Sequence, residues 1–297
     1  MRLGVDLGGT KIEIIALADD GGVLLRQRIP TPSGDYMATL MAIAGLVESA
    51  ESELGSRGSV GIGIPGAESL VSGLIKNANS TCLIGQPLRR DLQALLQREV
   101  RLANDANCFA LSEAVDGSGR DAKVVFGIIL GTGVGGGIVI DQQALTGANA
   151  IAGEWGHNPL PLPIGDDLPL PPCYCGRNGC IEAFLSGPAL SADHLRHTGQ
   201  HLGSDVIDHR AAAGDAACEA SLRRFEARLG RALAGVINIL DPQVIVIGGG
   251  LSGMQRLYRN LPECCRPYVF SDAFNTKFLP PMHGDSSGVR GAAWLWN

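Results

Sequence analysis

One local pattern recurs along the chain and limits what it can fold into: an apolar, strand-like run that ends in a glycine-rich turn. The three turns are DLGGTK (6–11), LGTGVGGG (130–137) and IGGGLS (247–252). Glycine allows a ligand close to the backbone, and successive N–H groups in such turns can bind an anion. A single glycine-rich turn is more often a tight hairpin, but three turns that each follow a strand favour a nucleotide. Neither the P-loop nor the dinucleotide fingerprint fits, because no G-x4-G-K-[ST] occurs and the first turn leads into a strand.

The order of the expected elements indicates a mixed α/β fold. In the first part of the chain we expect strands at 2–6, 11–17, 23–29, 59–65 and 101–103, and helices at 35–54, 87–100 and 104–115. This order predicts a mixed sheet with helices on its faces. The strand–turn–strand pattern restarts at Val124, an irregular segment occupies 141–187, and a long helix is expected at 216–240. The restart predicts a second domain, with a boundary near 115–122.

Charge and hydrophobic runs exclude several classes of partner. The 297 residues carry 30 acidic and 24 basic side chains, a net charge of −6, without a Lys/Arg cluster suited to nucleic acid or an anionic membrane. The longest uncharged run, 124–140, is shorter than the roughly 20 apolar residues that span a bilayer. The N-terminus lacks the pattern of a signal peptide. These features predict a cytoplasmic protein with reduced thiols and no nucleic-acid or membrane partner.

Three of the eight cysteines, Cys173, Cys175 and Cys180, lie close together in sequence, and His157 lies upstream of them. A disulfide framework is typical of small secreted chains, and a redox pair needs a C-x-x-C spacing that this segment lacks. Three thiolates and one imidazole form a complete tetrahedral zinc set that leaves no position for a catalytic water. We therefore expect a structural zinc site, with ordinary buried thiols as the alternative.

Two aspartates follow strands at positions suited to chemistry. Asp6 ends the first strand beside the first glycine turn, where it is a candidate Mg²⁺ contact, directly or through water. Asp105 follows Asn104 at the junction of a strand and a helix. The helix N-terminus favours a carboxylate there, and that carboxylate could accept a proton from a substrate hydroxyl. The alternative for Asp105 is a simple helix N-cap, which spacing alone favours.

Two glutamates bracket the cysteine segment. Glu154 lies in GEWGH, and Glu182 follows Cys180 by two residues. Carboxylates can accept hydrogen bonds from sugar hydroxyls and so reject analogues that lack them. They can equally support His157 through hydrogen bonds, and the spacing does not decide between these roles.

The motifs occur together in the order found in one family. DLGGTK, ANDAN, GTGVGGG, GEWGH, CYCGRNGCIE and ILDPQVIVIGGG resemble the ROK family of sugar kinases, repressors and related proteins, and the resemblance runs from Gly4 to the C-terminus. KNANST, VRLANDANC, GEWGHNPLP and HGDSSGVRGAAWLW look most like the fructokinase members of that family, also called manno(fructo)kinases. One departure is Cys82, where many relatives carry tryptophan, and it leaves the shape of the pocket mouth open.

The resemblance implies an α/β, actin-like ATPase (ribonuclease H-like) fold with two lobes around a cleft. The smaller lobe would comprise 1–118, with the C-terminal helix 287–297 packing back on it, and the larger lobe 119–286 would carry the zinc-binding segment. The resemblance further implies ATP-dependent phosphorylation of a hexose, normally on C6, with ATP, Mg²⁺ and structural Zn²⁺ as cofactors and a homodimer as the assembly. The expected reaction converts D-fructose to fructose 6-phosphate, with mannose as a second substrate.

The resemblance also implies roles for individual residues. Asp105 matches the general base, and His157, Cys173, Cys175 and Cys180 match the zinc ligands. The nucleotide-binding positions are Gly4, Asp6, Gly8, Gly9, Thr10, Lys11, Gly131, Thr132, Gly133, Val134, Gly135, Gly136, Gly248 and Gly249. The sugar-binding positions are Gly66, Asn79, Asn104, Asp105, Glu154, His157 and Glu182. Because the glycine turns lie elsewhere in the chain, we expect loss of zinc to weaken sugar binding more than nucleotide binding.

Other substrates and another class of protein remain as alternatives. Glucokinase and N-acetylglucosamine kinase are the alternative enzymes. The hexoses in question differ in configuration at C2 and in ring form, and the sequence motifs do not distinguish these properties. A sugar-responsive repressor of the same family would carry a helix-turn-helix domain ahead of the kinase-like body. The first expected strand begins at Arg2, which leaves no room for that domain, so we expect an enzyme.

Overall fold

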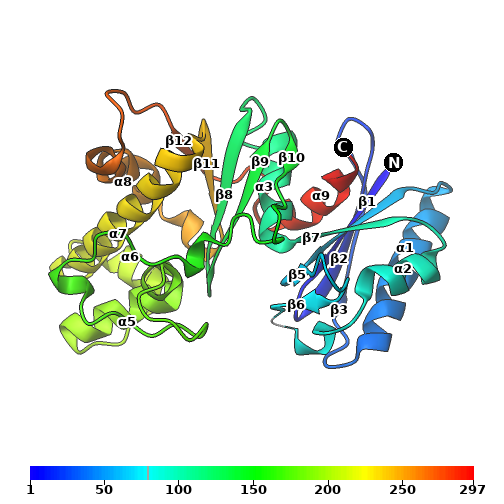
Figure 1. The fold of residues 1–297 in the computed structure, drawn as a ribbon, viewed down its shortest axis with the longest axis horizontal. Coiled ribbons are helices and arrows are strands. Elements are labelled where there is room, and N and C mark those ends of the chain that lie inside the picture. The colour runs from blue at the N-terminus through cyan, green and yellow to red at the C-terminus, as the bar shows by residue number, and fades with distance from the viewer. Residues whose placement is uncertain (79) are drawn as a thin grey trace. The chain divides into compact units, whose positions relative to one another are not determined.

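The computed structural model describes residues 1–78 and 80–297 (Figure 1). The chain divides into two compact units. Unit 1 comprises Met1–Asp121, Gly137–Ala152 and Met282–Asn297, and unit 2 comprises Ala122–Gly136 and Gly153–Pro281. The sequence-based division differs from this one, since it placed 137–152 with the second lobe and the boundary at 118.

Unit 1 is built on a five-stranded sheet in the order β3-β2-β1-β4-β7. The strands are β1 (Arg2–Leu7), β2 (Lys11–Leu17), β3 (Val23–Pro30), β4 (Ser59–Ile64) and β7 (Val100–Asn104), and a short hairpin of β5 (Ala67–Glu68) and β6 (Ile75–Lys76) follows β4. β2 pairs antiparallel with β1 and β3, whereas β1, β4 and β7 are parallel neighbours. The carboxyl ends of β1, β4 and β7 therefore share one edge of the sheet.

Helices cover both faces of this sheet (Figure 1). They are α1 (Tyr36–Leu54) and α2 (Leu88–Leu96) on one side, and α3 (Asp105–Val115) and α9 (Ser287–Ala293) on the other. α9 lies very close to the strands: a Cβ at Gly4 would lie 2.1 Å from the Val289 carbonyl oxygen, and one at Gly61 would lie 1.9 Å from that of Ala292. Glycine in the middle of β1 and β4 is thus explained by helix packing.

Two acids at the end of α3, the buried Glu113 and the half-buried C-cap Asp116, hold the C-terminal segment. Glu113 is fully buried and accepts hydrogen bonds from the Ser287 hydroxyl at 2.7 Å and the Met282 N–H at 3.0 Å. Asp116 forms an ion pair with Arg290. The helix that begins with the candidate general base is therefore bound near its other end to the C-terminal segment.

The second sheet has the order β10-β9-β8-β11-β12, and the division between the units falls within β9. Its strands are β8 (Val124–Leu130), β9 (Val134–Ile140), β10 (Gln143–Ala144), β11 (Val244–Gly248) and β12 (Lys277–Leu279). β8, β11 and β12 are parallel neighbours. The helices of unit 2 are α4 (Glu182–Leu185), α5 (Gly187–Thr198), α6 (Ser204–Ala212), α7 (Ala216–Leu240) and α8 (Gln255–Cys265). The long helix predicted at 216–240 is confirmed as α7.

Some predicted elements differ from the structure. The helix predicted at 87–100 ends at Leu96, because Gln97 adopts a left-handed conformation with φ of 51° and Val100 already pairs with β4. The irregular segment 141–187 contains the strand β10, short 3-10 turns, the short helix α4 and the first residue of α5. None of the helices in the described part of the chain is long and apolar enough to cross a membrane.

Candidate active site

The carboxyl edge of the first sheet brings several of the predicted residues together. The in-register pairing of β1 with β4 and of β4 with β7 places Asp6, Gly66 and Asn104 at or just beyond neighbouring strand ends. The Asn104 side-chain amide donates to the Gly66 carbonyl oxygen at 3.0 Å. Gly66 has a φ of 81°, and a Cβ there would lie 2.4 Å from the Lys76 carbonyl oxygen. Glycine at position 66 is therefore required both by its backbone conformation and by the space around it.

Asp105 is the first residue of α3, and Asn104 is the N-cap. The Asn104 side-chain oxygen accepts the Ala106 N–H at 2.9 Å, so the capping role that was the alternative for Asp105 belongs to its neighbour. One Asp105 oxygen also accepts this N–H, at 2.8 Å. Asp105 is exposed and lies at the positive end of the helix dipole, where a negative charge is favoured. A carboxylate in this position can receive a proton from an approaching hydroxyl.

Both carboxylates and cations act on Asp6, and burial together with the carboxylates outweighs the lowering effect of Lys11 and Arg28 on its pKa. Burial first, and then the charges of Asp105 and Glu13, raise the pKa of Asp6 to about 6. Glu13 pairs with Asp6 across β1 and β2, is 1 % exposed, and forms ion pairs with Arg26 and Arg28 of β3. A divalent cation beside these carboxylates would be strongly favoured by their charge. The sequence pattern pointed to Asp6 but not to Glu13, whose position depends on strand register.

The first glycine turn connects β1 and β2 tightly. The Gly8 N–H donates to the Lys11 carbonyl oxygen at 3.0 Å, and the Thr31 hydroxyl donates to the Gly8 carbonyl oxygen at 2.7 Å. Gly9, Thr10 and Lys11 are exposed, so their backbone N–H groups can reach a ligand. Gly4, which was grouped with this turn, lies instead within β1 against α9.

The second and third glycine turns meet at the carboxyl edge of the second sheet, because they follow the parallel neighbours β8 and β11. A Cβ at Gly249 would lie 2.5 Å from the Leu130 carbonyl oxygen, and one at Gly131 would lie 3.9 Å from the Gly250 nitrogen. The close approach therefore requires glycine at position 249, whereas a Cβ at position 131 would make only an ordinary contact. The carboxyl edge is where open α/β sheets bind ligands.

The four predicted zinc ligands, His157, Cys173, Cys175 and Cys180, gather at one point of unit 2. Their ligand atoms all lie within 4.8 Å of one another. Cys173 Sγ lies 3.6 Å from His157 Nδ1, and Cys175 Sγ lies 3.6 Å from Cys180 Sγ. Two sulfur ligands at about 2.3 Å from a tetrahedral zinc would lie about 3.8 Å apart. The donor set and its spacing therefore fit a closed zinc site.

Tyr174 is a neighbour of this cluster that the sequence pattern did not single out. Its hydroxyl lies 3.0 Å from His157 Nε2, and the two rings meet edge to face. Because the Tyr174 hydroxyl contacts Nε2, the other ring nitrogen, Nδ1, faces the cysteine thiols. A hydrogen bond to the second ring nitrogen is the usual way in which a metal-binding histidine is oriented. The sequence feature that could have pointed to Tyr174 is its position between Cys173 and Cys175 in the C-x-C motif.

The two glutamates beside the cluster take different positions. Glu154 is exposed and precedes the 3-10 turn Trp155–His157. Glu182 begins α4, and its Oε2 accepts the Val134 N–H of the second glycine turn at 2.8 Å. We expected loss of zinc to spare nucleotide binding because the glycine turns lie elsewhere in the chain. The second glycine turn is nevertheless hydrogen-bonded to Glu182, two residues from Cys180, so this turn is not separate from the zinc segment in space.

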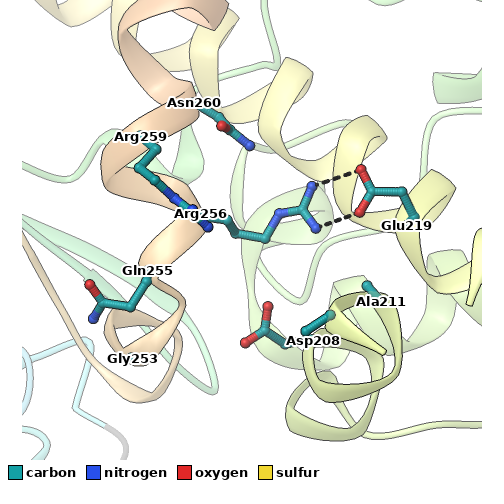
Figure 2. A pocket seen from close by; sticks show the side chains of 9 residues that line it. Asp208, Ala211, Glu219, Gly253, Gln255, Arg256, Arg259 and Asn260 are labelled. Atoms are coloured by element: carbon teal, nitrogen blue, oxygen red, sulfur yellow. Dashed lines mark hydrogen bonds and ion pairs between the residues drawn. The ribbon is translucent and has the colours of Figure 1, made fainter. Parts of the chain in front are cut away.

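A pocket of about 510 Å³ opens beside the third glycine turn (Figure 2). Its walls come from α6, the start of α7, the turn before α8 and the first half of α8: Asp208, Ala211, Ala212, Glu219, Gly253, Gln255, Arg256, Arg259 and Asn260. Figure 2 shows Arg256 reaching from α8 to Glu219 of α7, and Arg256 also pairs with the buried Glu226. The volume is within the range of small-molecule sites. No residue of this wall was singled out from the sequence.

Two predicted positions that follow Lys76 in the sequence remain. Asn79, a predicted sugar contact, lies outside the described residues. Cys82 is half-buried in the 3-10 turn Thr81–Leu83 and packs against the core of unit 1. Its side chain therefore contributes to packing in this part of the unit.

Glycine turns at the edges of two mixed α/β sheets can bind phosphate groups, and the carboxylates beside the first turn can bind a divalent cation. Residues 2–297 match the model of the ROK family, and the chain belongs to that family. It is a ROK family sugar kinase with the actin-like ATPase fold. The family and the fold class predicted from the sequence are thereby confirmed.

Similar proteins point to a narrower group. The chain is 42 % identical to an N-acetyl-D-glucosamine kinase of Yersinia pseudotuberculosis over 301 residues, which cover 99 % of this chain and 98 % of that protein. It is 40 % identical to an N-acetyl-D-glucosamine kinase of Vibrio atlanticus over 299 residues, 99 % of each chain. These relatives do not support the fructose specificity predicted from the motifs.

Two solved structures resemble the fold. The ROK hexokinase of Thermus thermophilus has a TM-score of 0.87 and 32 % identity, covering 99 % of this chain and 97 % of that one. A ROK family glucokinase from Streptomyces griseus, in complex with glucose and AMPPNP, has a TM-score of 0.76 and 27 % identity, covering 98 % and 97 %. The fold is thus shared with kinases of more than one hexose.

Proposed function

We propose that this chain transfers the terminal phosphoryl group of ATP to a hydroxyl of N-acetyl-D-glucosamine, on C6. The choice of sugar is supported by the relatives at 40 and 42 % identity over nearly the whole chain. The chemistry is carried by one observation, the position of Asp105 at the start of α3 with its charge acting on the half-buried Asp6.

Asp105 is the general base of the proposed reaction. As the hydroxyl oxygen attacks phosphorus, its proton passes to an oxygen of Asp105, and the bond from phosphorus to the leaving ADP oxygen breaks. Removing such a base typically lowers the rate by about 10²–10⁴. Asn104, which caps α3 and binds the Gly66 carbonyl oxygen, holds the start of the helix in place.

The glycine turns and the pocket beside the third turn bind the nucleotide in this proposal. Exposed N–H groups of the first turn, and those of the second and third turns, donate to phosphate oxygens. Asp6 holds Mg²⁺ directly or through water, and bound Mg²⁺ would neutralise phosphate charge. The pocket beside Gly253 takes the nucleoside, since it follows the third turn directly and has a suitable volume.

Zinc has a structural role in this proposal. His157, Cys173, Cys175 and Cys180 would hold one Zn²⁺ with no open position for a catalytic water. The cluster orders the segments that carry Glu154 and Glu182, whose carboxylates accept sugar hydroxyls. A displacement of about 1 Å in such groups can cost roughly 100-fold in rate.

Fructose, with mannose after it, is the second candidate substrate. It is favoured by the segments KNANST, GEWGHNPLP and HGDSSGVRGAAWLW, which look most like the fructokinase members of the family. The homodimer and the cytoplasmic location stay proposals on the same basis of family resemblance and composition.

A coupled ADP-release assay tests both substrates. We would measure kcat/KM for N-acetylglucosamine, fructose, mannose and glucose at several concentrations of each sugar. N-acetylglucosamine should give the highest value. A higher kcat/KM for fructose than for N-acetylglucosamine would make fructose the preferred substrate. Absence of ADP release with every hexose tested would contradict the kinase proposal itself.

A further inference from the structure

The carboxylate of Glu182 is packed directly against the second glycine turn. Its Oε2 accepts the Val134 N–H at 2.8 Å, across 48 residues of sequence. A Cβ at Gly133 would lie 2.6 Å from the same oxygen, although Gly133 does not have a positive φ. A Cβ at position 133 would therefore displace this carboxylate oxygen, whereas the backbone conformation there does not demand glycine.

Backbone hydrogen bonds connect the segment of Glu182 to the rest of the zinc cluster. The Ile181 N–H donates to the Asn158 carbonyl oxygen at 2.8 Å, and the Leu160 N–H donates to that of Gly179 at 2.8 Å. The segment that follows His157 and the segment that holds Cys180 thus form a short antiparallel bridge. Cys180 of the cluster lies two residues before Glu182, so an ordered cluster would also hold Glu182 in position.

A second connection reaches the turn from the histidine side. Trp155 lies in the same 3-10 turn as His157, is 4 % exposed, and donates from Nε1 to the Gly135 carbonyl oxygen at 2.9 Å. A Cβ at Gly156 would lie 2.2 Å from the Val134 carbonyl oxygen. The segment that carries His157 and the segment that carries Cys180 therefore both contact the second glycine turn.

We propose that Glu182 is a positioning residue that makes the order of the second glycine turn depend on the zinc cluster. This inference rests on the proposed function, in which that turn binds nucleotide phosphates. Oε2 is engaged by the turn, whereas Oε1 has no hydrogen-bond partner in the described chain. One carboxylate can thus fix the phosphate-binding turn through Oε2 and accept a sugar hydroxyl through Oε1.

Amide hydrogen exchange tests the positioning role without relying on activity. We would follow the peptide that spans 130–137 in the wild-type protein and in Glu182→Ala, both zinc-loaded, and in the wild-type protein after a chelator has removed the metal. A hydrogen bond to a charged group should protect this turn by about 10- to 100-fold, so its exchange should rise by that factor in Glu182→Ala. Zinc removal should raise it in the wild-type protein and raise it less in Glu182→Ala.

Matched variants separate positioning from sugar contact. Glu182→Gln keeps an oxygen that can accept the Val134 N–H, so it should restore most of the protection and most of the affinity for a nucleotide analogue. Glu154→Gln changes a carboxylate that, among the described residues, forms no hydrogen bond with the turn, and exchange over 130–137 should stay at the wild-type rate. Exchange in peptides of unit 1 checks that each variant is folded.

The outcomes are distinct from those that test the kinase proposal. Unchanged exchange over 130–137 in Glu182→Ala, with only the sugar KM raised, would overturn the positioning role and leave a sugar contact. Unchanged exchange after zinc removal would overturn the dependence on the cluster. Failure of the kinase proposal would appear as absence of ADP release in the wild-type protein, whatever the exchange data show.

Discussion

The carboxylates of Asp6 and Asp105 interact strongly: after burial, the charge of Asp105 is the largest contribution that raises the pKa of Asp6 to about 6. Asp6 lies near the end of β1 and Asp105 directly follows β7, with β4 paired between these two strands. Their relation is therefore fixed by the register of three parallel strands. A change at either residue should be felt at the other.

Asp105→Asn should lower kcat by about 10²–10⁴ while sugar binding is largely retained, because the amide cannot accept the hydroxyl proton. Loss of the Asp105 charge should also lower the pKa of Asp6. Steady-state kinetics with N-acetylglucosamine measure the first effect, and calorimetric titration with the sugar measures the retained binding. A variant with a near wild-type kcat would show that another group is the base.

Asp116→Asn should destabilise the protein in a pH-dependent way. Burial alone would raise the pKa of Asp116, but hydrogen bonds from His283 and Arg290 outweigh burial and hold it below its usual range. A carboxyl whose pKa is lower in the folded state stabilises the protein above its unfolded value of about 3.9, and this stability is lost as the pH falls through the folded value. At pH 7 the free energy of unfolding should fall by about 3 kcal/mol, since Arg290 loses its partner.

Urea unfolding of the wild-type protein and Asp116→Asn between pH 3 and pH 8 measures this difference. It should be largest at neutral pH and shrink towards pH 3. Asp272→Asn, at an exposed acid, is the matched control and should change the free energy by no more than about 0.5 kcal/mol. An equal Asp116→Asn effect at pH 3 and pH 7 would contradict the assignment of the ion pair.

The parts of the site that follow strand ends could be predicted from the sequence. A strand that ends in a glycine turn is a local pattern, and parallel pairing then brings such ends to one edge, as with Asp6 and Asn104. The cysteine spacing is equally local, since Cys173, Cys175 and Cys180 lie within eight residues. Local patterns thus fixed most of the candidate residues and the class of the fold.

Contacts that depend on register or on distant segments could not be predicted. Glu13 reaches Asp6 only through the pairing of β1 with β2, and Glu182 reaches Val134 across 48 residues. The Ser287 hydroxyl meets Glu113 across 174 residues, which no spacing rule could reveal. The helix predicted at 87–100 was too long because the left-handed conformation of Gln97 leaves no signal in apolar periodicity.

Removing one zinc ligand should remove the metal. Wild-type protein should contain one Zn²⁺ per chain by elemental mass spectrometry, and Cys175→Ser should contain far less, because a closed site needs all four ligands. The variant should also unfold at a lower temperature. Cys264→Ser, at a half-buried cysteine outside the cluster, should keep its zinc. An active wild-type protein without zinc would refute the structural role.

Gly133→Ala should weaken nucleotide binding by about 1.5–3 kcal/mol, the usual contribution of a hydrogen bond to a charged group, because the new Cβ would lie 2.6 Å from Glu182 Oε2 and displace it from Val134. Titration with a non-hydrolysable ATP analogue measures the loss. Gly235→Ala in α7 is the control: a Cβ there meets nothing within 4 Å, so this variant should bind normally and be slightly more stable. Equal affinity in both variants would argue against close packing at the turn.

The pocket beside the third turn should control nucleotide affinity. Ala212 is exposed and lines the pocket, so Ala212→Trp would place a bulky indole in the space proposed for the nucleoside. Affinity for the ATP analogue should fall at least tenfold, while affinity for the sugar should stay within about twofold, because the proposed sugar contacts lie elsewhere. Ala213→Trp is the matched control, since Ala213 is the next residue, is also exposed, and does not line the pocket. Paired calorimetric titrations of the two variants decide the matter: unchanged nucleotide affinity in Ala212→Trp would place the nucleoside outside this pocket.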